Sequence, residues 1–340
     1  MRTIRWGMIG CGNVAEVKSG PGFQKANHSR LTAVMRRTGA LAKDYAQRHG
    51  APKWYDNAEA LIEDPEVDAV YIATPPAFHK AYTLMSAQAR KPVYVEKPMA
   101  LNFEECQMMI TACRAAGVPL FVAYYRRALP RFLKVKELLD ARAIGEVRFV
   151  TMTLRRPLAA DELTLHTLPW RVIPEIAGGG RFVDLASHML DLLDYLLGPI
   201  RHVHGFASNQ ARRYPAEDIV TGAFVFESGV HGVGSWCFTG YDRWEQTEIV
   251  GTEGKIAYTI FDDRPILLTT SQGSTPFSFT SPPHIQQPLI QTVVDALNRV
   301  GVCPSTGESA ARTSWAWTRC GRGSNKDDRQ NTIYYACMTF

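Results

Sequence analysis

Lys97 stands at the end of a short apolar run, in the segment VYVEKPMA at residues 93–100. The run predicts a buried strand, and in open α/β sheets ligands bind beyond the carboxyl ends of the strands. An ammonium group at that position can hydrogen-bond a reacting oxygen and stabilise the negative charge that develops on it. Pro98 fixes the next turn and biases Lys97 toward an extended backbone. The alternative interpretation is a surface lysine at a strand end.

Asp184 and His188 form a second candidate pair. They are four residues apart in GGGRFVDLASHMLDLLDYLLG, which predicts a helix, so both side chains share one helix face. Histidine is the natural proton donor near neutral pH, and a neighbouring carboxylate raises its basicity and orients its ring. A capping or core histidine is the alternative interpretation.

A glycine-rich turn near the N-terminus is typical of dinucleotide binding. Gly10, Gly12 and Ala15 follow a strand-like run and open a helix, with Asn13 and Val14 between them. The first glycine permits a tight turn, the second lets the backbone approach a pyrophosphate, and the small third residue lets the helix pack closely. The free N–H groups at the helix N-terminus favour the anion. A plain tight turn is the alternative.

The end of the second predicted strand indicates which dinucleotide binds. A free ribose 2′-hydroxyl is usually bound by an acidic residue there. This chain has Arg36, Arg37 and Thr38 instead, with no carboxylate before Asp44. Arginine suits a 2′-phosphate by charge and by its planar fork. We therefore predict NADP (NADPH) as the cofactor, with NAD as the alternative if these arginines are solvated loop charges.

The elements that must position these groups follow two patterns. Up to residue 125, strand-like runs alternate with helical segments, which predicts βαβ units in a parallel Rossmann sheet. Between residues 200 and 280 alternating strands are joined by glycine-containing turns, which predicts an open, mostly antiparallel sheet with one face covered and the other free. We therefore predict an α/β plus α+β chain, with a dinucleotide-binding Rossmann domain (1–125) and a substrate and oligomerisation domain (126–315).

Composition argues against several classes of protein. The chain has 340 residues, of which 46% are hydrophobic and 21% charged, and a formal charge of +5, as in an ordinary two-domain globular protein. No apolar run approaches the length of about 20 residues that spans a bilayer, and no secretory signal is recognisable, so we predict a cytoplasmic protein with no membrane partner. The seven scattered cysteines form no C-x-x-C pair and predict no metal site. No basic stripe with aromatics predicts nucleic-acid binding.

The chain resembles the glucose–fructose oxidoreductase and inositol dehydrogenase (Gfo/Idh/MocA) family. The segments GMIGCGNVA, VDAVYIATPPAFH, VYVEKPMALNFEEC and GGGRFVDLASHMLDLLDYLLG carry the resemblance in family order. It implies a Rossmann domain, a second domain on a large, mostly antiparallel sheet, and hydride transfer between nicotinamide and a carbonyl or alcohol of a sugar-like substrate. It also implies a homo-dimer or higher homo-oligomer formed through the free face of that sheet. The segment HTLPWRVIPEIAGGG is similar to the NADPH-preferring branch of bacterial 1,5-anhydro-D-fructose reductase.

The resemblance also implies roles for the candidate residues. His188 becomes the general acid for carbonyl reduction, with Asp184 as its partner or as an acceptor for a substrate hydroxyl, and Lys97 can share or exchange the acid role. A cis peptide before Pro98 is expected, and Glu96 is expected to position backbone or cofactor groups. His79 is expected near the cofactor, or is an ordinary residue at a helix N-terminus, and Trp170 and Arg171 are expected near cofactor and substrate, or are a packing tryptophan and a surface arginine. Thr74 and Pro75 are expected to line the dinucleotide cleft; Tyr124, Tyr125 and Arg126 are further pocket candidates.

The last segment, 316–340, departs from the family pattern. It is polar and shows neither helical nor strand periodicity. One hypothesis is a shifted reading frame, because permissible codons for AWTR read Met-Asp-Gln in the neighbouring frame. Independent sequencing of the gene would test it. A natural disordered tail is the alternative.

Three functions stay open from the sequence. The first is an NADPH-dependent reductase, or the reverse dehydrogenase, acting on a sugar-like or small carbonyl substrate. The second is an NAD-dependent glycoside hydrolase-type relative, in which the cofactor oxidises a sugar transiently; Arg36 and Arg37 argue against it. The third is a non-catalytic dinucleotide sensor, against which the intact Lys97, Asp184 and His188 argue.

Overall fold

The N-terminal part of the chain forms a six-stranded parallel sheet. The computed structural model describes residues 1–162 and 168–321. The strand order is β3-β2-β1-β4-β5-β6, and all neighbouring strands are parallel. The inner strands are buried almost throughout, as expected for a sheet with helices on both faces. The strands are β1 (Ile4–Ile9), β2 (Ser29–Met35), β3 (Lys53–Tyr55), β4 (Ala69–Ile72), β5 (Val93–Val95) and β6 (Leu120–Val122).

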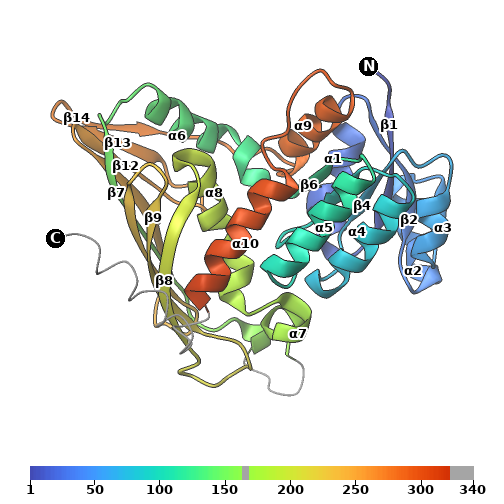
Figure 1. Ribbon diagram of the computed structural model, residues 1–340, viewed down its shortest axis with the longest axis horizontal. Coiled ribbons are helices and arrows are strands. Elements are labelled where there is room, and N and C mark those ends of the chain that lie inside the picture. The colour runs from blue at the N-terminus through green and yellow to red at the C-terminus, as the bar shows by residue number, and fades with distance from the viewer. Residues whose placement is uncertain (163–167, 322–340) are drawn as a thin grey trace.

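Helices cover both faces of this sheet (Figure 1). Side chains of Asn57 and Asn102 accept backbone N–H groups and begin two of these helices, and Gly50, in the left-handed conformation, ends another. Gly20, Pro21 and Gly22 open another helix, because proline fits the first helical turn. The elements are the π-helix η1 (Ala15–Ser19), α1 (Gly20–Lys25), α2 (Gly39–His49), α3 (Ala58–Glu63), the short turn η2 (Pro76–Phe78), α4 (His79–Gln88) and α5 (Phe103–Ala115).

The second part of the chain is built on an eight-stranded sheet. Its order is β14-β13-β12-β11-β7-β10-β9-β8, and every neighbouring pair is antiparallel except β10 and β7, which are parallel. The predicted fold class, a Rossmann sheet followed by a large, mostly antiparallel open sheet, is confirmed. The strands are β7 (Val147–Arg155), β8 (Ile200–Ser208), β9 (Ile219–Phe226), β10 (His231–Cys237), β11 (Trp244–Gly251), β12 (Gly254–Tyr258), β13 (Ile266–Thr270) and β14 (Gly273–Phe277).

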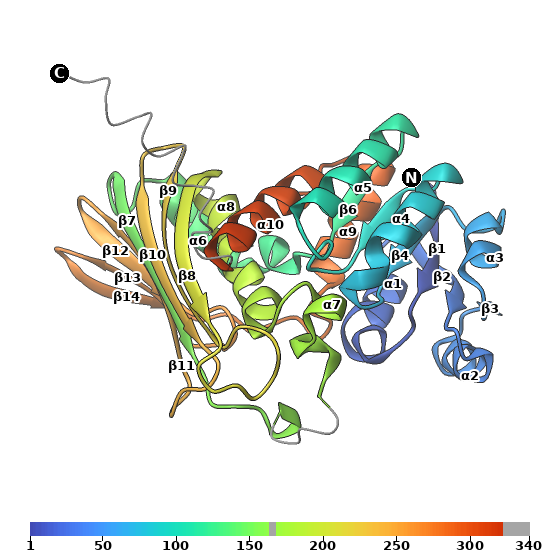
Figure 2. The ribbon, with the colours of Figure 1, turned by 60° about the horizontal axis from the view of Figure 1, so that its bottom comes forward.

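One face of the large sheet carries helices α6 (Pro130–Asp140), α8 (Ser187–Leu197) and α10 (Gly307–Gly321), which separate it from the Rossmann sheet (Figures 1 and 2). Burial alternates along β10, with Gly232, Gly234 and Trp236 buried between more exposed residues. None of the described helices lies on the opposite face in either view (Figure 2). The expected homo-oligomer through that face stays a prediction.

The two C-terminal helices return the chain to the Rossmann domain. Helix α9 (Gln287–Leu297) contacts α1, α10 contacts both α5 and β8, and Phe121 pairs with Thr306. The two units therefore interlock. Helix α10 continues to Gly321 with Trp317 and Cys320 buried, so the predicted start of the atypical tail at residue 316 falls inside this helix. The rest of that predicted tail, 322–340, lies outside the described residues.

Short helical turns connect these elements at the domain boundary. They are η3 (Tyr125–Ala128), η4 (Ala160–Glu162), η5 (Trp170–Val172), α7 (Pro174–Ala177) and the π-helix η6 (Phe182–Ala186). Among the described helices, none has both the length and the apolar composition to cross a membrane. Within residues 1–162 and 168–321, no group of three His, Cys, Asp or Glu side chains is placed to hold a metal ion.

Candidate active site

A cavity of about 620 Å³ lies at the carboxyl ends of the Rossmann strands, where side chains from the second domain close it. Fifteen of the residues predicted as catalytic or cofactor-binding line it: Gly10, Gly12, Asn13, Val14, Arg36, Arg37, Thr38, Thr74, Pro75, Glu96, Lys97, Trp170, Arg171, Asp184 and His188. The cavity therefore brings together the glycine turn, the arginine pair and the two candidate catalytic groups.

The glycine turn has the shape that a pyrophosphate needs. Gly10 has a φ of +93°, and a Cβ there would lie 2.9 Å from the backbone carbon of Ala73. A Cβ on Gly12 would meet no atom closer than 4.0 Å, so its absence leaves open space beside the backbone. Ala15 does not line the cavity: it is buried behind the turn, where its carbonyl accepts a hydrogen bond from Tyr45. These residues fit a dinucleotide phosphate at this end.

The far end of the cavity, beyond β2, is cationic. Arg36, Arg37 and Thr38 line it, and the Arg37 guanidinium lies 5.4 Å from the centre of the Phe78 ring. The carboxylates among the described lining residues are those of Glu96 and Asp184. This end can therefore accept an additional phosphate, and it offers no carboxylate to a free ribose hydroxyl.

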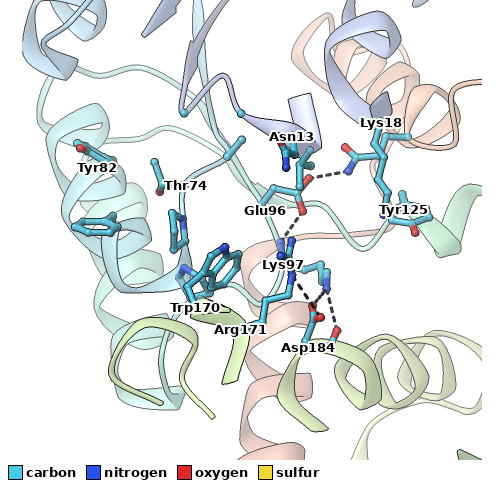
Figure 3. Close-up of a pocket in the computed structure, with 18 of the residues that line it drawn as sticks. Asn13, Lys18, Thr74, Tyr82, Glu96, Lys97, Tyr125, Trp170, Arg171 and Asp184 are labelled. Carbon is cyan, nitrogen blue, oxygen red and sulfur yellow. Dashed lines mark hydrogen bonds and ion pairs between the residues drawn. The ribbon is translucent and has the colours of Figure 1, made fainter. Parts of the chain in front are cut away.

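At the other end, Lys97 and Asp184 form an ion pair (Figure 3). The Lys97 ammonium donates to Asp184 Oδ1 at 2.7 Å and to the Asp184 carbonyl at 2.9 Å. The expected cis peptide is present between Lys97 and Pro98. Burial opposes ionisation of Asp184, but Lys97, followed by Arg171 and Arg181, lowers the pKa of its carboxyl to about 2. Asp184 is thus a permanent anion that holds the ammonium in place.

The predicted pairing of Asp184 with His188 is not what the structure contains. Lys97 takes the carboxylate, and the backbone between the two residues is a π-turn rather than a regular α-turn, so the spacing of four does not place them as expected. The ring of His188 instead packs edge-on against Tyr124, Tyr125 and Phe261, with centroids 5.9, 5.5 and 6.2 Å away.

His188 is only 4% exposed, and its Nδ1 has no hydrogen-bond partner among the described residues. Burial, and then the positive charges of Arg126, Lys97 and Lys18, lower the pKa of this imidazole well below its ordinary value. The imidazole is therefore neutral near neutral pH. In that form it can accept a proton or share a hydrogen bond, but it is not a resident proton donor.

Glu96 anchors the strand end that carries Lys97. Its Oε1 accepts hydrogen bonds from Tyr71 at 2.6 Å and from Gln286 at 2.7 Å, and its Oε2 accepts the Lys97 N–H at 3.2 Å. Gln286 lies just before α9, so the Glu96 carboxylate links α9 to β4 and β5. The positioning role predicted for Glu96 is consistent with these contacts.

Trp170 and Arg171 enter the cavity from η5 (Figure 3). The Arg171 guanidinium lies 4.5 Å from the centre of the Trp170 ring, and its Nε is 3.7 Å from Asp184. His79 does not line the cavity. It is fully buried, and its ring hydrogen-bonds the carbonyls of Thr74 at 2.7 Å and Pro98 at 3.1 Å. His79 therefore braces the two loops that line the site instead of facing a cofactor.

Several lining residues were absent from the predicted set or received little weight. Tyr125 and Arg126 line the cavity, whereas Tyr124 is buried behind it. Lys18 could have been found, because it lies about one helical turn beyond the glycine turn. Five further lining residues stand next to predicted residues in the chain, but their apolar side chains carry no cofactor-binding signal of their own: Met35, Ala73, Pro76, Phe78 and Leu185. The remaining unpredicted lining residues are Tyr82, Phe261 and Gln286.

A buried ion-pair cluster fixes the helix that carries His188. Arg127 donates to both carboxylate oxygens of Asp191, at 2.9 and 2.7 Å, and to Asp194 at 3.1 Å. Arg312 of α10 completes the cluster through two 2.8 Å hydrogen bonds to Asp194. The cluster joins the end of the Rossmann sheet, α8 and α10, and thereby sets the position of His188 relative to Lys97.

Comparisons with known proteins agree with this geometry. Residues 4–124 match the model described as "Oxidoreductase family, NAD-binding Rossmann fold", and residues 132–257 match the GFO/IDH/MocA C-terminal domain. "Oxidoreductase P35" of Formosa agariphila is 39% identical over 310 residues, which are 91% of this chain and 95% of the relative. The 1,5-anhydro-D-fructose reductase of Ensifer adhaerens is 29% identical over 89% of this chain and 91% of its own length.

A solved structure shares the fold. The aldose-aldose oxidoreductase from Caulobacter crescentus, complexed with glycerol, superposes with a TM-score of 0.83 at 25% identity, covering 94% of this chain and 98% of its own. The similarity therefore extends over both sheets and the cavity between them.

Proposed function

The chain belongs to the Gfo/Idh/MocA oxidoreductase family and is an NAD(P)-dependent oxidoreductase, and from that premise we propose that it is an NADPH-dependent reductase of a sugar-like carbonyl compound, or the reverse dehydrogenase. One observation carries the proposal. The same cavity holds two arginines beyond β2 at one end and the Lys97–Asp184 pair beside His188 at the other, with the glycine turn lining it as well. The names of the relatives support the sugar-like substrate.

Bound NADPH would supply the hydride, and the residues of the chain would handle the oxygen. As the hydride adds to the carbonyl carbon, the π electron pair moves to the oxygen, which must receive a proton. The Lys97 ammonium, oriented by Asp184 at 2.7 Å, is the donor that we assign. The sequence analysis assigned this role to His188, with Lys97 able to share or exchange it; the lowered pKa of the His188 imidazole favours Lys97 as the donor. In the reverse direction the same path runs backward: Lys97 first passes its proton to the neutral His188 imidazole and then, as the free amine, takes the proton of the substrate hydroxyl.

The decisive experiment is a panel of aldoses, ketoses and small carbonyl compounds, followed at the nicotinamide absorbance with NADPH and NADH compared. Net oxidation of NADPH by at least one member supports the proposal. A clear preference for NADH would contradict the assignment of the arginines. Cleavage of glycosides without net nicotinamide turnover would instead favour the glycoside hydrolase-type alternative.

The cofactor assignment predicts the effect of removing Arg36. We expect Arg36→Gln to raise the KM for NADPH by about 10- to 100-fold, because a charge-assisted hydrogen bond to the 2′-phosphate is worth about 1.5–3 kcal/mol. The KM for NADH, which has no such phosphate, should change by less than about threefold by the same reasoning. Steady-state kinetics with both cofactors measure the two values.

Arg48→Gln is the matched control for this prediction. Arg48 lies outside the cavity and pairs with Glu16 and Asp44 near the surface, so its loss removes the same charge without touching the cofactor site. If Arg36→Gln changes the KM for NADPH and the KM for NADH by the same factor, Arg36 does not bind the 2′-phosphate.

A further inference from the structure

Arg126 is a buried cation without an anionic partner. It is 7% exposed, it lines the cavity, and its guanidinium lies 4.8 Å from the ring centres of both Tyr125 and Phe261. Its Nε donates to the Ile260 carbonyl at 3.3 Å, while its Nη1 is buried with no hydrogen-bond partner in the described part of the chain. A guanidinium in such a position has donors left to satisfy.

The two neighbouring arginines, Arg127 and Arg131, have hydrogen-bond partners for their guanidinium groups. Arg127 is saturated by Asp191 and Asp194, and Arg131 donates to the carbonyls of Asp262 and Arg264. No carboxylate lies within ion-pair distance of Arg126 among the described residues. The carboxylate of Glu245, in β11, instead accepts hydrogen bonds from the backbone N–H groups of Ile260 and Phe261. The structure therefore holds the Arg126 guanidinium between two rings but gives it no carboxylate in direct contact within the described part of the chain, which is costly unless a ligand supplies the anion.

Arg126 lies close to the reacting groups. Tyr125 and Phe261, which enclose its guanidinium, also contact the ring of His188, at 5.5 and 6.2 Å. Lys18 reaches the same end of the cavity beside Tyr125 (Figure 3), and it too has no ion-pair partner among the described residues. Although burial raises the pKa of Tyr125, the charges of Arg126, Lys18 and Lys97 lower it overall. Positive charge is therefore concentrated where the substrate would bind.

We propose that Arg126 binds a carboxylate of the substrate, so that the substrate class is a sugar acid whose carboxylate is a few bonds from the carbon that exchanges hydride. This proposal rests on the proposed function. The planar guanidinium fits a carboxylate through two parallel hydrogen bonds, and Lys18 adds a second positive charge. The cofactor phosphates would be held by the glycine turn and by Arg36 beyond β2, which leaves Arg126 free for the substrate.

The test uses matched pairs of uronates and their neutral amides: D-glucuronate with D-glucuronamide, and D-galacturonate with D-galacturonamide. Each compound is titrated into the NADPH complex and followed by NADPH fluorescence, and each is also measured as an inhibitor of the carbonyl substrate found in the panel. We expect at least one acid to bind about 10- to 100-fold more tightly than its amide, as one charge-assisted contact provides. Arg126→Gln should abolish that ratio.

Arg131→Gln is the matched control, since Arg131 is a buried arginine on the next helix that does not line the cavity; it should keep the ratio. Arg126→Lys keeps the charge and provides a measurable variant if the glutamine variant does not fold; it should lose part of the ratio. Acids that bind no better than amides in the unmodified protein, or a ratio that survives Arg126→Gln, would overturn the proposal. In that case turnover of neutral sugars with NADPH would leave the proposed function intact, whereas failure of the whole carbonyl panel would remove the proposed function itself.

Discussion

The Lys97→Met variant is expected to lose about 100- to 1,000-fold in kcat while still binding NADPH. Methionine preserves the length and the apolar stem but removes the ammonium that would meet the developing charge on the substrate oxygen. Because this interaction forms in the transition state, the loss should appear in kcat and kcat/KM together. Steady-state assays give the kinetic change, and NADPH fluorescence titration gives the cofactor affinity.

The replacement also leaves Asp184 as a buried anion without its cation, so two controls are needed. The Lys97→Met/Asp184→Asn double variant removes that unpaired charge and should remain equally inactive. Lys80→Met breaks a 2.7 Å ion pair with Glu105 outside the cavity and should keep full activity. Retention of wild-type kcat by a folded Lys97→Met protein would remove Lys97 from the mechanism.

The second large effect concerns His188 and pH. With a neutral sugar alcohol and NADP⁺, we expect titration of His188 to leave the oxidation rate unchanged at and above pH 6.5, its ordinary pKa, because burial and then Arg126, Lys97 and Lys18 hold its pKa well below that value. The neutral imidazole is the proton acceptor, so protonation abolishes the reaction. The rate should therefore fall only as the pH drops through the lowered pKa. Asp184, whose carboxyl has a pKa of about 2, remains ionised above that pH.

His188→Gln removes this proton acceptor. We expect about a 100-fold or greater loss of the oxidation rate, the usual contribution of a positioned base, together with loss of the acidic limb of the pH profile. His49→Gln is the control, because His49 pairs with Glu16 outside the cavity and should leave both the rate and the profile unchanged. An acidic limb that persists unchanged in the His188 variant would assign the titration to another group.

Much of the fold follows from local patterns. The apolar run before Lys97 and the glycine turn at Gly10 predicted β5 and the β1–η1 junction, since burial on both faces of a parallel sheet requires continuous apolar strands. The edge strand β3 and helix α3 were not predicted. Strand β3 is as short as β5 but is only partly buried, so it lacks the continuous apolar run that marked β5. The atypical tail was predicted to begin too early, at residue 316, because the polar residues near the end of α10 masked the buried face formed by Ala316, Trp317 and Cys320.

The sequence by itself determined which side chains stand at strand ends and helix starts, because these positions depend on the order and periodicity of neighbouring residues. Only the tertiary structure decided the partners. Lys97 and Asp184 are 87 residues apart, and their ion pair replaced the expected pair of Asp184 and His188. Likewise the burial of Arg126 between Tyr125 and Phe261, which gives it a role as an anion site, depends on a contact across 134 residues to Ile260. Such contacts depend on how the two sheets and the returning C-terminal helices pack, and no short stretch of sequence encodes that packing.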